Sequence, residues 1–169
     1  MSSRPHTGHT RRRLLSSGST ALESVQFDVL FRQDDADPVV IHDLADVGML
    51  TFELFDLGLV DGALVLVDER RQVTAILLDP PPNIDLMLRW AREPDIGAEF
   101  SQVILIVARD RIAFAPPCDE DIAVYRSAQQ MCIADGLLWM DLIIANTHKM
   151  QSIGIVCDPD SVWLDPVEF

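Results

Sequence analysis

The chain has 169 residues, 49% of them hydrophobic and 24% charged, and its formal net charge is −14 at pH 7. This length suits one domain that buries a core without disulfides or structural metal, and no apolar run approaches the roughly 20 residues of a membrane-spanning helix. The acidic balance excludes unaided binding to nucleic acid or anionic lipid, because phosphate contacts need clustered lysine and arginine. We therefore expect a soluble, cytoplasmic protein with no direct nucleic-acid or membrane partner.

The charge is unevenly distributed along the chain. Residues 1–20 carry four arginines and no acidic residue, whereas the remainder holds 9 basic and 27 acidic residues, a net charge of −18. The opening stretch is rich in serine, threonine, glycine and histidine, so we expect residues 1–22 to be a disordered basic tail and residues 23–169 to form a single domain. Twelve arginines against one lysine favour a bacterial source with a GC-rich genome.

The first half of the domain predicts a strand, a helix and a hairpin. Residues 25–31 (VQFDVLF) have strand composition. From Asp43 to Gly58, apolar residues recur at steps of three and four, which predicts an amphipathic helix. Two nearly continuous apolar runs at 63–68 and 73–78 follow. The charged turn between them predicts a β-hairpin whose strands are covered on both faces.

The second half alternates helices with strands. Asn83 is expected to cap a helix with one apolar stripe, and residues 103–107 (VILIV) form the strongest buried-strand candidate. Further elements are expected as a helix at 119–135 ended by Gly136, strands at 137–145 and 152–156, and an edge strand in the tail at 158–169. This alternation predicts a three-layer α/β sandwich with a mixed central β-sheet flanked by helices.

No familiar catalytic motif is present. The three cysteines are widely spaced and form no CxxC pair, which suits a reducing cytosol and excludes a disulfide framework or zinc ribbon. The four histidines form no HExxH or HxH pair, and no phosphate-binding, dinucleotide-binding or esterase signature occurs. Function must therefore be sought in a less regular pattern.

The most informative segment runs from the predicted strand at 103–107 through a loop to a helix that begins at Asp119. It reads VILIVARDRIAFAPPCDEDIAVYRSAQQMCIADGLLWMDLIIAN. This segment resembles the JAB/MPN metalloprotease-like domain, in particular its RadC branch. There a buried strand runs into a His-x-His ligand pair, a Pro-Ser-x-Glu-Asp segment starts the next helix, and a Leu-Asp-His strand follows. The resemblance is specific over residues 103–146 and covers 40–156 in element order, which implies a JAB/cytidine-deaminase-like fold.

The residues that would hold metal in that family are mostly replaced here. The resemblance places Ala108 and Asp110 at the two histidine positions, Cys118 at the motif serine, and Asp121 at the third ligand. Alanine has no ligating atom. Two carboxylates alone suit weak Mg²⁺ or Ca²⁺ contact better than zinc, which takes three protein ligands in hydrolytic sites.

The remaining machinery is also incomplete. Asp141 keeps the acid of the Leu-Asp-His strand, but Leu142 replaces the histidine, and Asp85 is the only candidate near the position of the catalytic glutamate. We therefore expect a degenerate, metal-free relative with no catalytic, cofactor or metal residue. Arg109 and Arg111 are expected to pair with nearby carboxylates, so that arginine neutralises the charge that metal would have balanced.

These observations leave three functional hypotheses. The first is a non-catalytic interaction module that binds a basic protein surface or a second copy of itself. The second is a hydrolase with a divalent metal at Asp110 and Asp121, aided by Asp141 and Cys118. The third is an acidic regulator that binds a nucleic-acid-binding protein. Asp121 could instead simply favour a helix start, where acidic residues interact well with the helix dipole, and Cys118 is expected to be an inert thiol.

Overall fold

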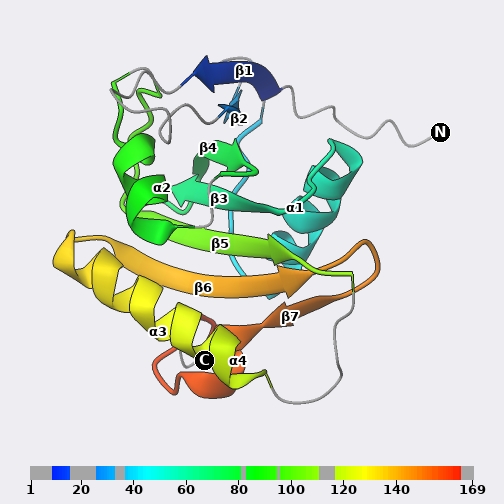
Figure 1. Ribbon diagram of the computed structural model, residues 1–169, viewed down its shortest axis with the longest axis vertical. Coiled ribbons are helices and arrows are strands. Elements are labelled where there is room, and N and C mark those ends of the chain that lie inside the picture. The colour runs from blue at the N-terminus through cyan, green and yellow to red at the C-terminus, as the bar shows by residue number, and fades with distance from the viewer. Residues whose placement is uncertain are drawn as a thin grey trace.

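A computed structural model of the chain describes residues 9–15, 26–32, 37–80, 83–94, 96–110 and 117–164. These residues form a seven-stranded sheet in the order β1-β2-β4-β3-β5-β6-β7 (Figure 1). The strands are β1 (His9–Leu15), β2 (Gln26–Arg32), β3 (Gly62–Val67), β4 (Val73–Leu78), β5 (Gln102–Ala108), β6 (Leu138–Ala145) and β7 (Met150–Ser152). The helices are α1 (Leu44–Asp56), α2 (Ile84–Ala91), α3 (Asp119–Ala134) and α4 (Ile153–Cys157), followed by a 3₁₀ turn, η1 (Val162–Leu164).

The sheet is mixed and lies between two helical layers. Strands β5 and β6 run parallel, whereas the other neighbouring pairs are antiparallel. Side chains alternate along β3, so that Leu64 and Leu66 join the hydrophobic cluster under α2 and α3, and Val65 joins the one under α1. The predicted α/β sandwich with a mixed central sheet is therefore confirmed.

The local signals for helix boundaries are confirmed. Asp43 accepts a hydrogen bond from the backbone N–H of Asp46 at 3.0 Å, and the Asp46 carboxylate accepts one in return from the Asp43 N–H at 3.3 Å. Asn83 accepts from the Leu86 N–H at 3.2 Å and so starts α2. Gly136, just beyond the last turn of α3, has a φ of 73°, which glycine adopts without strain.

Residues 9–15 correct one expectation. They fall in the stretch expected to be a disordered tail, yet they form β1, which pairs antiparallel with β2 along its whole length. The opposite edge of β2 pairs with β4, so without β1 the outer backbone groups of β2 would have no strand partner. Backbone pairing needs no apolar side chains, and composition alone therefore gave no sign of it. Residues 1–8 and 16–22 lie outside the described residues.

The structure of the C-terminal segment corrects two further predictions. The predicted strand at 152–156 is wrong: β7 ends at Ser152, and residues 153–157 form α4. Ser152 Oγ accepts from the Ile155 N–H at 3.2 Å, and Asp141 accepts from the Gly154 N–H at 2.8 Å, so these N–H groups serve a helix start rather than a strand ladder. The predicted edge strand at 158–169 is likewise a 3₁₀ turn over Val162–Leu164, and residues 165–169 lie outside the described part.

No helix in the described ranges is long and apolar enough to cross a membrane.

Candidate functional site

The candidate site lies where β5 and β6 end side by side. Because the two strands are parallel, both carboxyl ends reach the same edge of the sheet, and Ala108 pairs with Ala145 there. The Arg109 N–H extends this pairing by donating to the Ala145 carbonyl at 2.9 Å. Helix α3 begins beyond the loop, with Asp121 in its first turn. The strand–loop–helix arrangement expected from the sequence therefore brings the two ends of the loop together.

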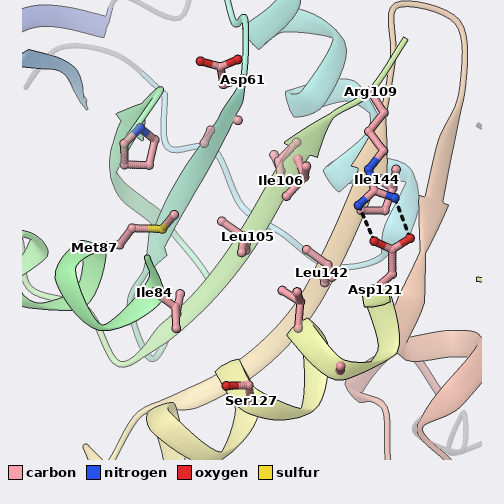
Figure 2. Close-up of a pocket in the computed structure, with 16 residues that line it drawn as sticks. Asp61, Ile84, Met87, Leu105, Ile106, Arg109, Asp121, Ser127, Leu142 and Ile144 are labelled. Carbon is pink, nitrogen blue, oxygen red and sulfur yellow. Dashed lines mark hydrogen bonds and ion pairs between the residues drawn. The ribbon is translucent and has the colours of Figure 1, made fainter. Parts of the chain in front are cut away.

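Arg109 and Asp121 form a two-pronged ion pair across this loop (Figure 2). Arg109 Nη1 donates to Asp121 Oδ2 at 2.7 Å, and Nη2 donates to Oδ1. The Asp121 side chain is only 6% exposed, whereas that of Arg109 is 40% exposed. The predicted pairing of Arg109 with a nearby carboxylate is thus confirmed. Arg111 lies outside the described residues.

The electrostatics of the pair keep both groups ionised. Burial by itself raises the pKa of Asp121, but hydrogen bonds from Arg109 and Cys118 outweigh it and hold the pKa below its ordinary value. The hydrogen bond to Asp121 raises the pKa of Arg109 in turn. Each oxygen of the Asp121 carboxylate thus accepts from the guanidinium, whose charge balances that of the carboxylate.

The other predicted site residues do not converge on Asp121. Ala108 ends β5 without a ligating atom. Asp110 is exposed, and its backbone carbonyl accepts from the Asn146 side chain at 3.5 Å. Asp85 is exposed on α2, where it pairs with Arg89 at 3.5 Å. Over the described ranges, no three or more His, Cys, Asp or Glu residues gather into a group that could hold a metal ion.

Cys118 is exposed and precedes the first turn of α3. It occupies the N-cap position, but its side chain makes no capping hydrogen bond. A thiol is a weak acceptor, which accounts for the missing capping bond. The Cys118 side chain helps to hold the pKa of Asp121 below its ordinary value.

Asp141 is fully buried and belongs to a separate network. Its carboxylate accepts from four donors in the segment that follows it or in its own strand: the N–H groups of Leu142 and Gly154 at 2.8 Å, Trp163 Nε1 at 2.7 Å, and Ser152 Oγ. Burial raises the pKa of Asp141, and the hydrogen bonds work against that rise. With its oxygens so occupied, Asp141 fastens the C-terminal segment to β6 and takes no part in a ligand set with Asp121.

A cavity of about 800 Å³ lies beside the ion pair, between the sheet and helices α2 and α3 (Figure 2). Its sheet side is formed by Leu105, Leu142 and Ile144, and α2 contributes Ile84 and Met87. Helix α3 adds an exposed face of small and mid-sized side chains, namely Ala123, Val124 and Ser127. Sequence reasoning missed this cavity, because its lining comes from separate elements whose juxtaposition only the fold reveals.

The rim of the cavity next to Asp61 is held rigidly. Asp79 has a φ of 49°, unusual for a residue other than glycine. Its Oδ1 accepts the backbone N–H groups of Val60, Asp61 and Gly62 at 3.2, 2.7 and 3.1 Å. A Cβ atom at Gly62 would lie 2.5 Å from the Ile106 carbonyl oxygen, so the turn sits directly against β5. The rim is therefore held by the Asp79 carboxylate and by the close approach of Gly62 to the Ile106 carbonyl.

Comparisons of the chain with protein-family models, with curated proteins and with solved structures found no match.

Proposed function

We propose that the chain is a non-catalytic interaction module with a JAB/RadC-like fold, in which an arginine–carboxylate pair takes the place of a catalytic metal. The observation that carries this proposal is the two-pronged contact of Arg109 with Asp121. Asp121 is the residue that the resemblance aligns with the third metal ligand. Arginine binds a carboxylate through parallel N–H···O bonds, so it supplies the balancing charge that a cation would supply in a metal site.

The donor set does not fit the zinc ion that the resemblance would imply. A hydrolytic zinc site takes three protein ligands and keeps an open position for water. Ala108 offers no ligating atom, Asp110 is exposed, and each oxygen of Asp121 already accepts from Arg109. The Asp141 carboxylate already accepts from four donors. We therefore derive no hydrolytic step for this chain.

The order of elements supports the resemblance from which the proposal starts. A helix, a hairpin, a helix, a buried strand, a loop, a third helix and a parallel strand follow one another from α1 to β6. The resemblance implies this order for residues 40–156. We propose on this basis that the three-layer sandwich is of the JAB/cytidine-deaminase type.

The surface supports a basic protein partner or self-association. The net charge of −14 attracts a basic surface over several ångströms of solvent. Large apolar side chains are exposed on α1, where Met49 is 71% and Phe52 37% exposed, and again in the C-terminal segment, where Val156 is 54% exposed. The three cysteines are unpaired, which supports a cytoplasmic location.

Elemental analysis tests the loss of metal. Protein purified without chelator is expected to contain far less than one equivalent of zinc or iron, and Asp110→Ala and Asp121→Ala are expected to leave the metal content unchanged. Stoichiometric metal that is lost in either variant would overturn the proposal and favour the carboxylate hydrolase.

Co-purification tests the interaction. At low salt, a basic protein partner or a second copy is expected to bind, and an electrostatic contact is expected to weaken at high salt because ions screen it. Analytical ultracentrifugation of the purified chain measures self-association, and mass spectrometry of cross-linked complexes from source cells identifies a basic protein partner. A chain that is monomeric and without a specific basic partner at every salt concentration would refute the interaction function.

A further inference from the structure

The cavity between the sheet and helices α2 and α3 has the size and lining of a small-molecule site. Its volume of about 800 Å³ falls in the usual range of ligand pockets, roughly 300–1,000 Å³. Leu105, Leu142 and Ile144 line it from the sheet, and Ile84 and Met87 line it from α2 (Figure 2). A ligand in this space removes its own apolar surface and that of the exposed Ala123 and Val124 side chains from water, which is the main source of affinity in such pockets.

The charges around the cavity select the polarity of its ligand. Arg109 and Asp121 form its polar wall, but they neutralise each other. Asp61, at the rim, is exposed to water. An anionic group would face the carboxylates of Asp121 and Asp61, and a charged group of either sign would lose hydration against the apolar walls. An uncharged polar group avoids both penalties.

Arg109 also offers the hydrogen bond that would orient such a ligand. A guanidinium has five N–H donors, and Asp121 accepts from two of them. The Arg109 side chain is 40% exposed, so its remaining donors can reach an acceptor that enters the cavity. A carbonyl or hydroxyl oxygen supplies that acceptor without adding charge.

We propose that this cavity binds an uncharged, largely apolar small molecule whose acceptor oxygen lies against Arg109. The inference depends on the same ion pair as the proposed function but not on that function, because a small-molecule site can exist with or without a protein partner.

Three probes that share a phenylbutyl group and differ in the charge of the head group test which ligand charge the cavity prefers. They are 4-phenylbutanamide, 4-phenylbutanoate and 4-phenylbutylamine, each titrated into the full chain by isothermal titration calorimetry. The amide is expected to bind about three- to tenfold more tightly than either charged probe, because a charged group loses more hydration on entering the cavity. Equal or tighter binding of the carboxylate or the amine would overturn the proposal, and so would the absence of any binding by the amide.

A matched pair of variants tests whether the amide probe binds in this cavity. Ser127 and Gln130 are both exposed on α3, and Ser127 lines the cavity whereas Gln130 does not. Ser127→Trp fills the cavity from a position that tolerates a larger side chain, and it is expected to abolish amide binding. Gln130→Trp is expected to bind as the wild type does. Amide binding that survives Ser127→Trp would show that the probe binds elsewhere and would refute the assignment. Metal content, measured on the same samples, reports separately on the proposed function.

Discussion

Replacing Arg109 and replacing Asp121 should lower the free energy of unfolding by unequal amounts. Arg109→Met leaves a carboxylate that is 6% exposed without its guanidinium. Removing one partner of a fully buried pair costs about 3–5 kcal/mol. Since 40% of Arg109 is exposed, water screens part of the interaction, and we expect a loss of about 2–3 kcal/mol in the free energy of unfolding.

Asp121→Leu removes the buried charge itself. Arg109 is then free to turn toward water, so we expect a loss of about 1 kcal/mol or less. The double variant, Arg109→Met with Asp121→Leu, replaces the pair by apolar groups and is expected to lie within about 1 kcal/mol of the wild type. Urea unfolding, followed by the fluorescence of the buried Trp90 and Trp139, measures all three changes.

The pH dependence supplies a second readout of the same pair. The folded-state pKa of Asp121 lies below its unfolded value, so its contribution is complete above the unfolded value of about 3.9 and is lost as the pH falls through the folded value. The disadvantage of Arg109→Met relative to the wild type should therefore be largest near neutral pH and shrink in acid. Equal costs for the two single variants, or a cost that does not change with pH, would refute the reasoning.

Two further predictions concern the buried Asp141 network. Gly154→Ala places a Cβ atom 2.8 Å from Asp141 Oδ1 and is expected to lower the free energy of unfolding by about 1–3 kcal/mol, measured by thermal unfolding. Gly48→Ala is the control, because the atom nearest to the new Cβ there is Met150 Cε at 3.6 Å. The melting temperature of this control should not fall by a comparable amount. Asp141→Asn keeps the shape but turns a donor toward donors, so we expect a loss of about 1–3 kcal/mol and, because Trp163 loses its acceptor, a red shift of the total tryptophan emission. A variant as stable as the wild type, with unshifted emission, would contradict the assigned role of the carboxylate.

The sequence predicted features that depend on neighbours along the chain. Asp43 and Asn83 start their helices as expected, because a capping side chain bonds a backbone N–H only three residues away. The Arg109–Asp121 pair was also predictable, since the loop and the helix start fall at opposite ends of one short segment and the chain is rich in acid.

Features that depend on distant residues were not predictable from pattern alone. Residues 152–156 have strand composition, but Gly154 bonds Asp141, thirteen positions earlier, and this contact favours a helix. The cavity was not predicted for the same reason, because the residues that line it are distant in sequence. One signal was available: an aspartate inside the apolar run LLWMDLIIA must find donors when buried, and Asp141 does find four.

The attachment of the C-terminal segment to Asp141 has a consequence for how the chain can be shortened. The acceptor sits on an inner strand, whereas three of its four donors come from residues 152–163. A chain cut before Ser152 would still pair β6 with β5 but would leave the Asp141 carboxylate with a single remaining donor. Such a truncation would also remove the core packing of Ile153 and of the partly buried Val162 and Trp163, so we expect this end of the molecule to tolerate loss far less than its small size suggests.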